Sequence, residues 1–189
     1  MSIQREKTVR NLLAAWICLF MLGVLLPGAI ANAQVNNPNT DWFSAARVGV
    51  FIHFLPGDVK ALAQVKDFDV EVLAAQLEAA GAKYLVLTLG QNSGSMNSPN
   101  PTYTQVTGYA PGERCSTRDL PLDLYRVLAP RGIKLMLYLP CQAPNRDVRA
   151  QKAFGLAQGP KDQPIDMVFA AKWARVISDW STRYGDKVA

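Results

Sequence analysis

The chain has 189 residues, of which 49% are hydrophobic and 19% are charged. This length and composition are those of one globular domain with its own core, and they exclude a disordered chain. The formal net charge of +5 is small and dispersed. Nucleic-acid-binding domains concentrate Lys and Arg on one face, so we expect no nucleic-acid partner.

The first part of the sequence has the pattern of a secretory signal peptide. Basic residues precede an apolar run over residues 12–26, and Pro27 and Gly28 then break the helix. Ala31 and Ala33 are small side chains of the kind that a signal peptidase recognises. We therefore predict cleavage after Ala33 and a secreted or periplasmic protein.

This prediction divides the chain into a signal peptide at residues 1–33 and one domain at residues 34–189. The alternative is an uncleaved membrane anchor, since residues 12–31 are long enough to span a bilayer. Contact with a membrane would then come from this segment alone. The Pro–Gly break and the small residues at the expected cleavage site favour cleavage.

Residues 48–54 (VGVFIHF) form the first predicted strand, and Pro56 and Gly57 end it. His53 lies near the carboxyl end of this strand and is the only histidine in the sequence. Ligands of parallel sheets bind at that end of the strands, so His53 is a candidate binding residue. A lone histidine beside aromatic residues is also commonly a hydrogen-bonded core residue, and both interpretations stay open.

A helix and a second buried strand follow. Asp69 is expected to cap a helix over residues 70–80, in which apolar side chains recur at helical spacing. Gly81 suits the left-handed position that commonly ends a helix. The apolar, β-branched run over residues 83–89 then predicts a strand buried on both faces.

A polar loop, GQNSGS, follows the second predicted strand. Gln91 and Asn92 in this loop would lie at the same edge of the sheet as His53. Clusters of Gly, Asn and Ser are also ordinary turns, which is the alternative interpretation. Residues 91–117 are expected to be irregular, and loops of this length are commonly functional. The groups in this stretch that could stack on or hydrogen-bond a polar ligand are Tyr103, Tyr109, Arg114 and Arg118.

The last third of the sequence predicts two helices and one strand. Asp119 is expected to start a helix with Pro121 in its first turn. A third buried strand is expected over residues 133–139 and an amphipathic helix over residues 167–184. The order β-α-β-α-β-α predicts a parallel α/β sheet. Residues 187–189 resemble the start of a further strand.

Two cysteines, Cys115 and Cys141, lie outside the apolar N-terminal run. Both fall in loops at the carboxyl ends of neighbouring predicted strands, so we expect a disulfide between them in an exported protein. The alternative is two unrelated buried thiols. We find no metal-ligand cluster, phosphate-binding loop or Ser/His/Asp set in the sequence, and we therefore expect no metal site and no cofactor.

The order of these motifs resembles the α-L-fucosidase family of glycoside hydrolases. The similarity covers nearly all of residues 42–188 and implies an incomplete (β/α)8 TIM-type barrel, about its first three β/α units, after the signal peptide. The family hydrolyses α-L-fucosides with retention, which implies a fucosylated glycan as the carbohydrate partner. The segments that carry the resemblance are WFSAARVGVFIHF, AGAKYLVLT, RDLPLDL and KLMLY.

The resemblance implies that His53 matches the family's sugar-binding histidine at the end of the first strand. The family's two adjacent histidines after the second strand are absent, and Gln91 and Asn92 lie roughly in their place. The nucleophilic Asp would fall just beyond Ala189, and the acid/base carboxylate further on. Retaining hydrolysis needs two carboxylates about 5 Å apart. We therefore expect a truncated chain without catalytic residues and without activity of its own.

Two other interpretations stay open. The chain could be a non-catalytic carbohydrate-binding or structural relic that keeps a sugar-contacting rim. It could instead be a divergent hydrolase that acts on another glycan, because the adjacent histidines are absent.

Overall fold

The computed structural model describes residues 37–156 and 166–189. Residues Pro38–Ala189 form one compact unit. The predicted signal peptide, residues 1–33, lies outside the described residues and stays a prediction. Within the described ranges, no helix is long and apolar enough to cross a membrane.

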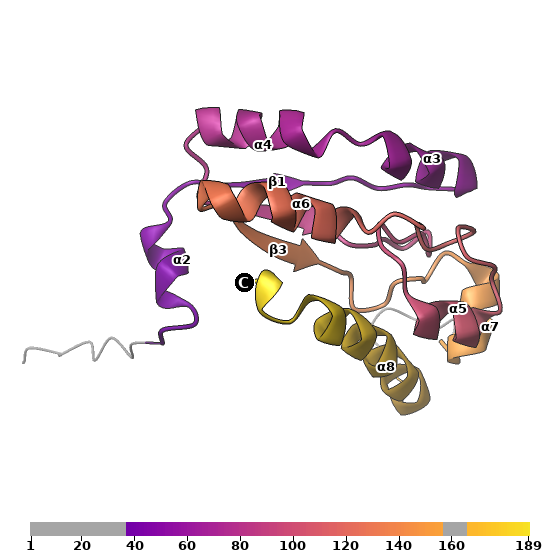
Figure 1. The fold of residues 1–189 in the computed structure, drawn as a ribbon. Helices are drawn as coiled ribbons and strands as arrows, with labels where there is room; N and C mark the ends of the chain where they lie inside the picture. Colours follow the sequence, from indigo (N-terminus) through magenta and orange to yellow (C-terminus); the bar gives the residue numbers. More distant parts are fainter. Residues whose placement is uncertain (1–36, 157–165) are drawn as a thin grey trace, which may run out of the picture. The chain divides into compact units, whose positions relative to one another are not determined.

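A parallel sheet of three strands in the order β1-β2-β3 organises the fold (Figure 1). The strands are β1 (Gly49–Ile52), β2 (Tyr84–Thr88) and β3 (Lys134–Tyr138). In the register, Ile52 pairs with Leu87, and Leu87 pairs with Leu137. The three strands predicted from apolar runs are therefore confirmed, each slightly shorter than expected.

Helices precede, connect and follow these strands. They are α2 (Asp41–Ala45), α3 (Val59–Ala63), α4 (Val70–Ala79), α5 (Pro101–Thr107), α6 (Leu120–Leu128), α7 (Val148–Phe154) and α8 (Met167–Tyr184), with 3-10 turns η1 (Gln64–Asp67), η2 (Ala129–Arg131) and η3 (Gly185–Lys187). The helices expected after Asp69 and Asp119 are confirmed, and the bounds of α8 agree with the prediction to the residue. Gly81 has the expected positive φ, 70°.

Besides α2, three short helices, α3, α5 and α7, were not predicted. Asp58, Asn100 and Asp147 cap them, each accepting a hydrogen bond from the backbone N–H three residues further on. Asp58 is therefore the cap of α3. The signal was present in the sequence, because Asp and Asn are strong N-cap residues and Asn100 precedes a proline at the first helical position.

One face of the sheet packs against α4 and α6 and forms the first core. Leu85, Leu87 and Leu135 of the sheet are buried there, together with Leu77 of α4 and Leu124 of α6. Because side chains alternate along a strand, one side chain in two of each strand lies in this core. The remaining side chains of β2 are also at least partly buried, which explains why this strand reads as an apolar run.

A second core lies beyond the carboxyl ends of the strands, where α5, α7 and α8 pack together (Figure 1). Tyr103 of α5 and Phe154 of α7 contact Trp173 of α8 through their rings, with centroids 6.3 and 5.3 Å away. All three side chains are buried. Tyr103, considered above as a ligand-stacking group, is thus a core residue, and its hydroxyl donates to the carbonyl of Gly94.

Helix α2 packs at the amino end of the sheet, on the face opposite the first core. The rings of Trp42 and Phe43 lie 6.1 and 5.0 Å from the ring of Tyr84. Lys134 of β3 places its ammonium 4.9 Å from the centre of the Trp42 ring, a cation–π contact. These contacts attach α2 to both β2 and β3.

The end of the chain contacts the outer edge of β3. The backbone N–H of Ala189 donates to the carbonyl of Leu135, 2.9 Å away. Val188 has extended backbone angles, whereas Lys187 belongs to η3. The sheet has three strands and none includes residues 187–189, so the expectation that these residues begin a further strand stays a prediction.

Candidate functional site

The loops that follow the three strands are joined at the carboxyl edge of the sheet. The hydroxyl of Thr88 and the side-chain amide of Asn97 both donate to the carbonyl of Phe54, at 2.9 and 2.8 Å. The N–H of Arg146 donates to the carbonyl of Asn92 at 2.8 Å. The loops after β1, β2 and β3 thus form one hydrogen-bonded layer.

His53 lies directly after β1, and its side chain is exposed. Its ring contacts Phe51 and Tyr138, with centroids 4.2 and 6.2 Å apart. The interpretation of His53 as a buried core residue is therefore wrong. Its position at the rim is as expected, and its role in binding stays a prediction.

Gln91 and Asn92 are half-buried and lie in a turn after β2. The side-chain oxygen of Gln91 accepts from the N–H of Asn92 at 2.7 Å, and its carbonyl accepts from Gly94 at 2.9 Å. The alternative interpretation as a turn is therefore correct for the backbone. The turn contacts the loop after β3 through Asn92 and the loop after β1 through Ser93, whose hydroxyl donates to the carbonyl of Pro56 at 3.0 Å. The ring contacts of His53 are instead with Phe51 and Tyr138. The three predicted residues share one edge of the sheet but belong to two clusters.

Carboxylates near the rim, in the part of the chain that the structure describes, have structural partners. Asp58 caps α3, and Glu113 accepts from the N–H of Ala110 at 2.5 Å. Asp119 caps α6 and also accepts from the hydroxyl of Tyr184 at 3.0 Å. Each of these carboxylates is engaged in holding a loop or helix start.

Asp147, a residue that the sequence did not single out, is the most buried of these acids. Its side chain is 3% exposed and lies 3.0 Å from Nε of Arg114. The hydroxyl of Tyr109 donates to it at 2.9 Å, and Arg149 lies over the Tyr109 ring at 4.3 Å. Burial alone would lower the pKa of Arg114, but its contacts with Tyr109 and Asp147 outweigh this and raise the pKa. Arg114 and Tyr109 therefore have structural partners, and their contact with a ligand stays a prediction.

Arg118 also has a structural role. Its guanidinium lies 2.8 Å from Asp123, and it donates to three backbone carbonyls around η1. It thus joins the start of α6 to the segment before α4.

The predicted disulfide is not formed. Both cysteines in the described residues are free, Cys115 buried and Cys141 exposed. Cys115 is fixed in the loop layer by a backbone bridge with Met96, and burial raises the pKa of its thiol to about 12. The two cysteines line different pockets. The loops that hold the two cysteines were predicted correctly, but the directions of their side chains were not.

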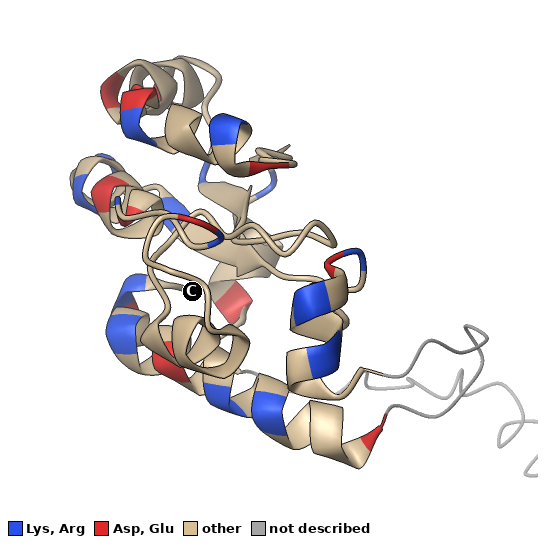
Figure 2. Cartoon of the chain, turned by 90° about the vertical axis from the view of Figure 1, so that its right-hand side faces the viewer, with Lys and Arg blue, Asp and Glu red and all other residues tan. Residues whose placement is uncertain are grey.

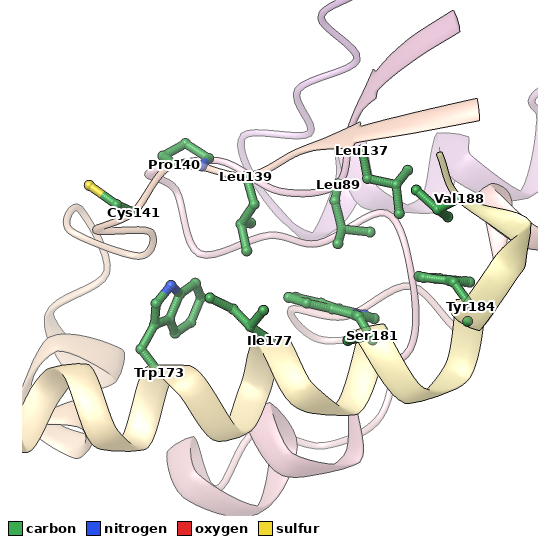
Figure 3. A pocket seen from close by; sticks show the side chains of 12 residues that line it. Leu89, Leu137, Leu139, Pro140, Cys141, Trp173, Ile177, Ser181, Tyr184 and Val188 are labelled. Carbon is green, nitrogen blue, oxygen red and sulfur yellow. The ribbon is translucent and has the colours of Figure 1, made fainter. Parts of the chain in front are cut away.

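An apolar pocket of about 400 Å³ lies between α8 and the carboxyl end of β3 (Figure 3). Figure 3 shows Leu137 and Leu139 on one side and Trp173 and Ile177 of α8 on the other. Of the predicted site residues, Cys141 lines this pocket, whereas His53, Gln91 and Asn92 do not. This pocket is therefore separate from the predicted binding rim.

In the part of the chain that the structure describes, neither the distribution of charged residues nor the possible metal ligands indicate a further binding site. Figure 2 shows acidic segments among the basic ones on the helices. Among the described residues, no group of three or more His, Cys, Asp or Glu side chains could hold a metal ion.

Three crystal structures of fucosidases share the fold of this chain. An α-L-fucosidase of glycoside hydrolase family 29 from Bacteroides thetaiotaomicron, trapped as a covalent intermediate, has a TM-score of 0.58 and 18% sequence identity. A second α-L-fucosidase structure of that family from this organism has a TM-score of 0.55 and 17% identity. A bacterial fucosidase with a monovalent iminocyclitol inhibitor has a TM-score of 0.54 and 17% identity.

Each match covers 81% of this chain and 40% of the fucosidase chain. The chain therefore spans less than half the length of these proteins. No family model matches the sequence, and no curated protein matches it. The resemblance inferred from the sequence is confirmed at the level of the fold.

Proposed function

We propose that this chain is the amino-terminal, carbohydrate-binding part of an α-L-fucosidase-type glycoside hydrolase, whose fold is a (β/α)8 barrel. The observation that carries the proposal is the common fold of 81% of the chain with three fucosidases. The parallel order β1-β2-β3 supports it, because consecutive parallel strands with intervening helices are how such a barrel is built.

The proposed ligand is a fucosylated glycan, and the proposed binding residues are His53, Gln91 and Asn92. His53 is exposed at the carboxyl edge of β1, where barrel enzymes bind their substrates. An imidazole and two amides supply both donors and acceptors for sugar hydroxyls. Because Gln91 already uses its side-chain oxygen within the turn, its contribution would come from the amide nitrogen.

We further propose that the chain by itself binds sugar without hydrolysing it. Retention requires a nucleophile and an acid/base, two carboxylates about 5 Å apart. Asp58, Asp119 and Asp147 instead cap helices. Because these carboxylates already cap helices, the second candidate function is a carbohydrate-binding protein that has no hydrolase activity. A divergent specificity for another glycan is a third, because Gln91 and Asn92 stand in place of the histidines.

Export is part of the proposal. The basic start, the apolar run over residues 12–26 and the small residues up to Ala33 support a cleaved signal peptide and a secreted or periplasmic protein. Contact with a membrane would arise only through an uncleaved segment. The amino-terminal sequence of the exported protein tests this: Gln34 at the start supports cleavage, and a retained Met1 contradicts it.

Calorimetric titration of the purified chain with L-fucose tests the binding proposal. We expect saturable binding that weakens at least about threefold in His53→Ala, the loss of about one hydrogen bond. Val72→Ala is the control, because Val72 is an exposed residue on α4. Incubation with 4-nitrophenyl α-L-fucoside should release no 4-nitrophenol above the buffer rate. Absent binding, or binding unchanged by His53→Ala, contradicts the proposed site, and turnover by the purified chain contradicts the proposed inactivity.

A further inference from the structure

The backbone pairing between β1 and β2 ends one residue before His53. The last paired residues are Ile52 of β1 and Leu87 of β2. A ladder of hydrogen bonds fixes the backbone over the residues that it pairs, so the position of His53 depends on what holds the chain after the ladder ends. Side chains from the end of β2 and from the loop that follows it supply these contacts.

Two side chains hold the carbonyl of Phe54, the residue directly after His53. The hydroxyl of Thr88 donates to this carbonyl at 2.9 Å, and the side-chain amide of Asn97 donates to it at 2.8 Å. The Thr88 hydroxyl also lies 3.4 Å from the carbonyl of Ile52. His53 is therefore held on both sides, by the sheet before it and by these two donors after it.

The two donors are themselves fixed. The side-chain amide of Asn97 also donates to the carbonyl of Thr88 at 2.8 Å, and the backbone N–H of Asn97 donates to the carbonyl of Leu89 at 2.7 Å. The exposed fraction of both Thr88 and Asn97 is 0%. Buried side-chain hydrogen bonds rigidify the segments that they join, so the carbonyl of Phe54 has one defined position relative to β2.

A second buried asparagine in the same loop shows a different role. Asn100 accepts from the N–H of Tyr103 at 2.7 Å, which caps α5, and its amide donates to the carbonyl of Val176 of α8 at 3.0 Å. Both partners belong to helices of the second core. Asn97 and Asn100 are thus almost equally buried, at 0% and 2% exposed, but hold different parts of the fold.

We propose that Asn97 and Thr88 are the positioning residues of His53, which fix the backbone beside it and thereby the direction from which its imidazole meets a sugar hydroxyl. The inference deepens the proposed function and rests on it. A hydrogen bond weakens steeply as its angle departs from linearity, so a histidine on a loosely held backbone would bind a hydroxyl less tightly. Because Asn97 and Thr88 are buried, their effect on the sugar is transmitted through His53.

The single histidine of the sequence makes the position of its ring measurable. In a purified chain without a histidine tag, the proton–carbon NMR spectrum contains one histidine ring signal, whose shift depends on the Phe51 ring 4.2 Å away. In Asn97→Ala and in Thr88→Val, this signal should move toward the position of an unstructured histidine. It should stay in place in Thr88→Ser, which keeps the hydroxyl, and in Asn100→Ala, which is the matched control.

Titration with L-fucose measures the effect on binding. Asn97→Ala should weaken the affinity about threefold or more, the effect of about one hydrogen bond, whereas Asn100→Ala should bind within about twofold of wild type. In a His53→Ala background, Asn97→Ala should cause no further loss, because a positioning residue acts through the residue that it holds. A merely structural role of Asn97 would instead make the two losses additive.

The outcomes separate this inference from the proposed function. If the histidine signal moves in Asn97→Ala and Thr88→Val but fucose does not bind to the wild type, the positioning of His53 stands and the proposed ligand is wrong. If fucose binds through His53 and the signal is unchanged in both variants, the positioning is wrong and the proposed function stands. An equal movement of the signal in Asn100→Ala, or additive losses of affinity in the double variant, also overturns the positioning. If Asn97→Ala gives no dispersed spectrum and so does not fold, the comparison of Thr88→Val with Thr88→Ser decides.

Discussion

The ring of Tyr84 occupies the space that a side chain at position 49 would need. A Cβ atom added to Gly49 would lie 2.0 Å from Cζ of Tyr84, well inside van der Waals contact. The same ring contacts Trp42 and Phe43 of α2. Gly49 therefore permits the close packing that attaches α2 to the sheet.

Gly49→Ala should accordingly destabilise the chain. We expect the free energy of unfolding to fall by about 1–3 kcal/mol, the usual cost of overpacking, as measured by urea denaturation. Gly57→Ala is the control, because a Cβ there has no atom within 4 Å. Adding Tyr84→Leu to Gly49→Ala should recover part of the loss, and an additive double variant would contradict this explanation.

Replacing Arg47 by glycine should stabilise the chain, in contrast to Gly49→Ala. Its φ of 53° is the only positive value of a non-glycine residue in the described ranges. Side chains cost about 1–2 kcal/mol in the left-handed region, whereas glycine adopts it freely. Arg47→Gly should therefore stabilise the chain by about 0.5–1 kcal/mol after the greater entropy of an unfolded glycine is subtracted.

Arg47→Ala separates backbone strain from the loss of the charged side chain. Alanine keeps the strained conformation, so its thermal midpoint should not rise. A stabilisation by Arg47→Ala equal to that of Arg47→Gly would show that the charge, and not the backbone, is unfavourable.

The strands and long helices were predictable because local sequence determines them. Residues 83–89 are apolar on both faces because both faces of β2 are partly buried, and α8 shows helical spacing over its whole length. The short helices were missed because each cap lies in a loop close to a proline, and a proline predicts the end of an element. Asn100, followed by a proline, is the residue from which the start of α5 could have been predicted.

The candidate site was predictable only in part. The position of His53 follows from the end of a strand, which the sequence marks with an apolar run. The contact between Phe51 and Tyr138 depends on the order of the strands and on their register, and no local pattern encodes these. The same reason explains the wrong disulfide, since loops at one sheet edge can direct cysteines to different surfaces.

The buried ion pair between Asp147 and Arg114 should contribute strongly to stability. Asp147→Ala leaves Arg114 without its counter-ion, removes the acceptor for Tyr109 and removes the cap of α7. Because the Arg114 side chain is 23% exposed, we expect the free energy of unfolding to fall by about 2–3 kcal/mol, less than the cost of about 3–5 kcal/mol for breaking a fully buried pair. Glu78→Ala is the control, because its ion pair with Arg131 is exposed and such pairs contribute about 0–1 kcal/mol. Equal losses of unfolding free energy in Asp147→Ala and Glu78→Ala would contradict a strong contribution of the Asp147–Arg114 ion pair.

The two cysteines should differ in their reaction with a thiol reagent. Cys141 is exposed and should react with Ellman's reagent within seconds to minutes at pH 8, whereas Cys115 should react only after addition of denaturant. Burial excludes the reagent from Cys115, and its raised pKa keeps the thiol protonated. In the chain cleaved after Ala33, which lacks Cys18, one fast equivalent followed by one denaturant-dependent equivalent is the expected result. No reactive thiol in the native protein would instead support a disulfide.

The buried thiol of Cys115 should make the free energy of unfolding depend on pH in the alkaline range. The pKa of Cys115 is raised from 9.0 to about 12 in the folded chain, so the folded state keeps a proton that the unfolded state loses above pH 9. Its contribution to stability is complete below pH 9 and is lost as the pH rises toward 12. The free energy of unfolding should fall by about 1.4 kcal/mol per pH unit from this group. Tyr103 and Tyr184 have raised pKa values of the same sign and add to the loss above pH 10. Urea denaturation of wild type and Cys115→Ala between pH 8 and pH 10 isolates the cysteine, and parallel curves for the two proteins would contradict the prediction.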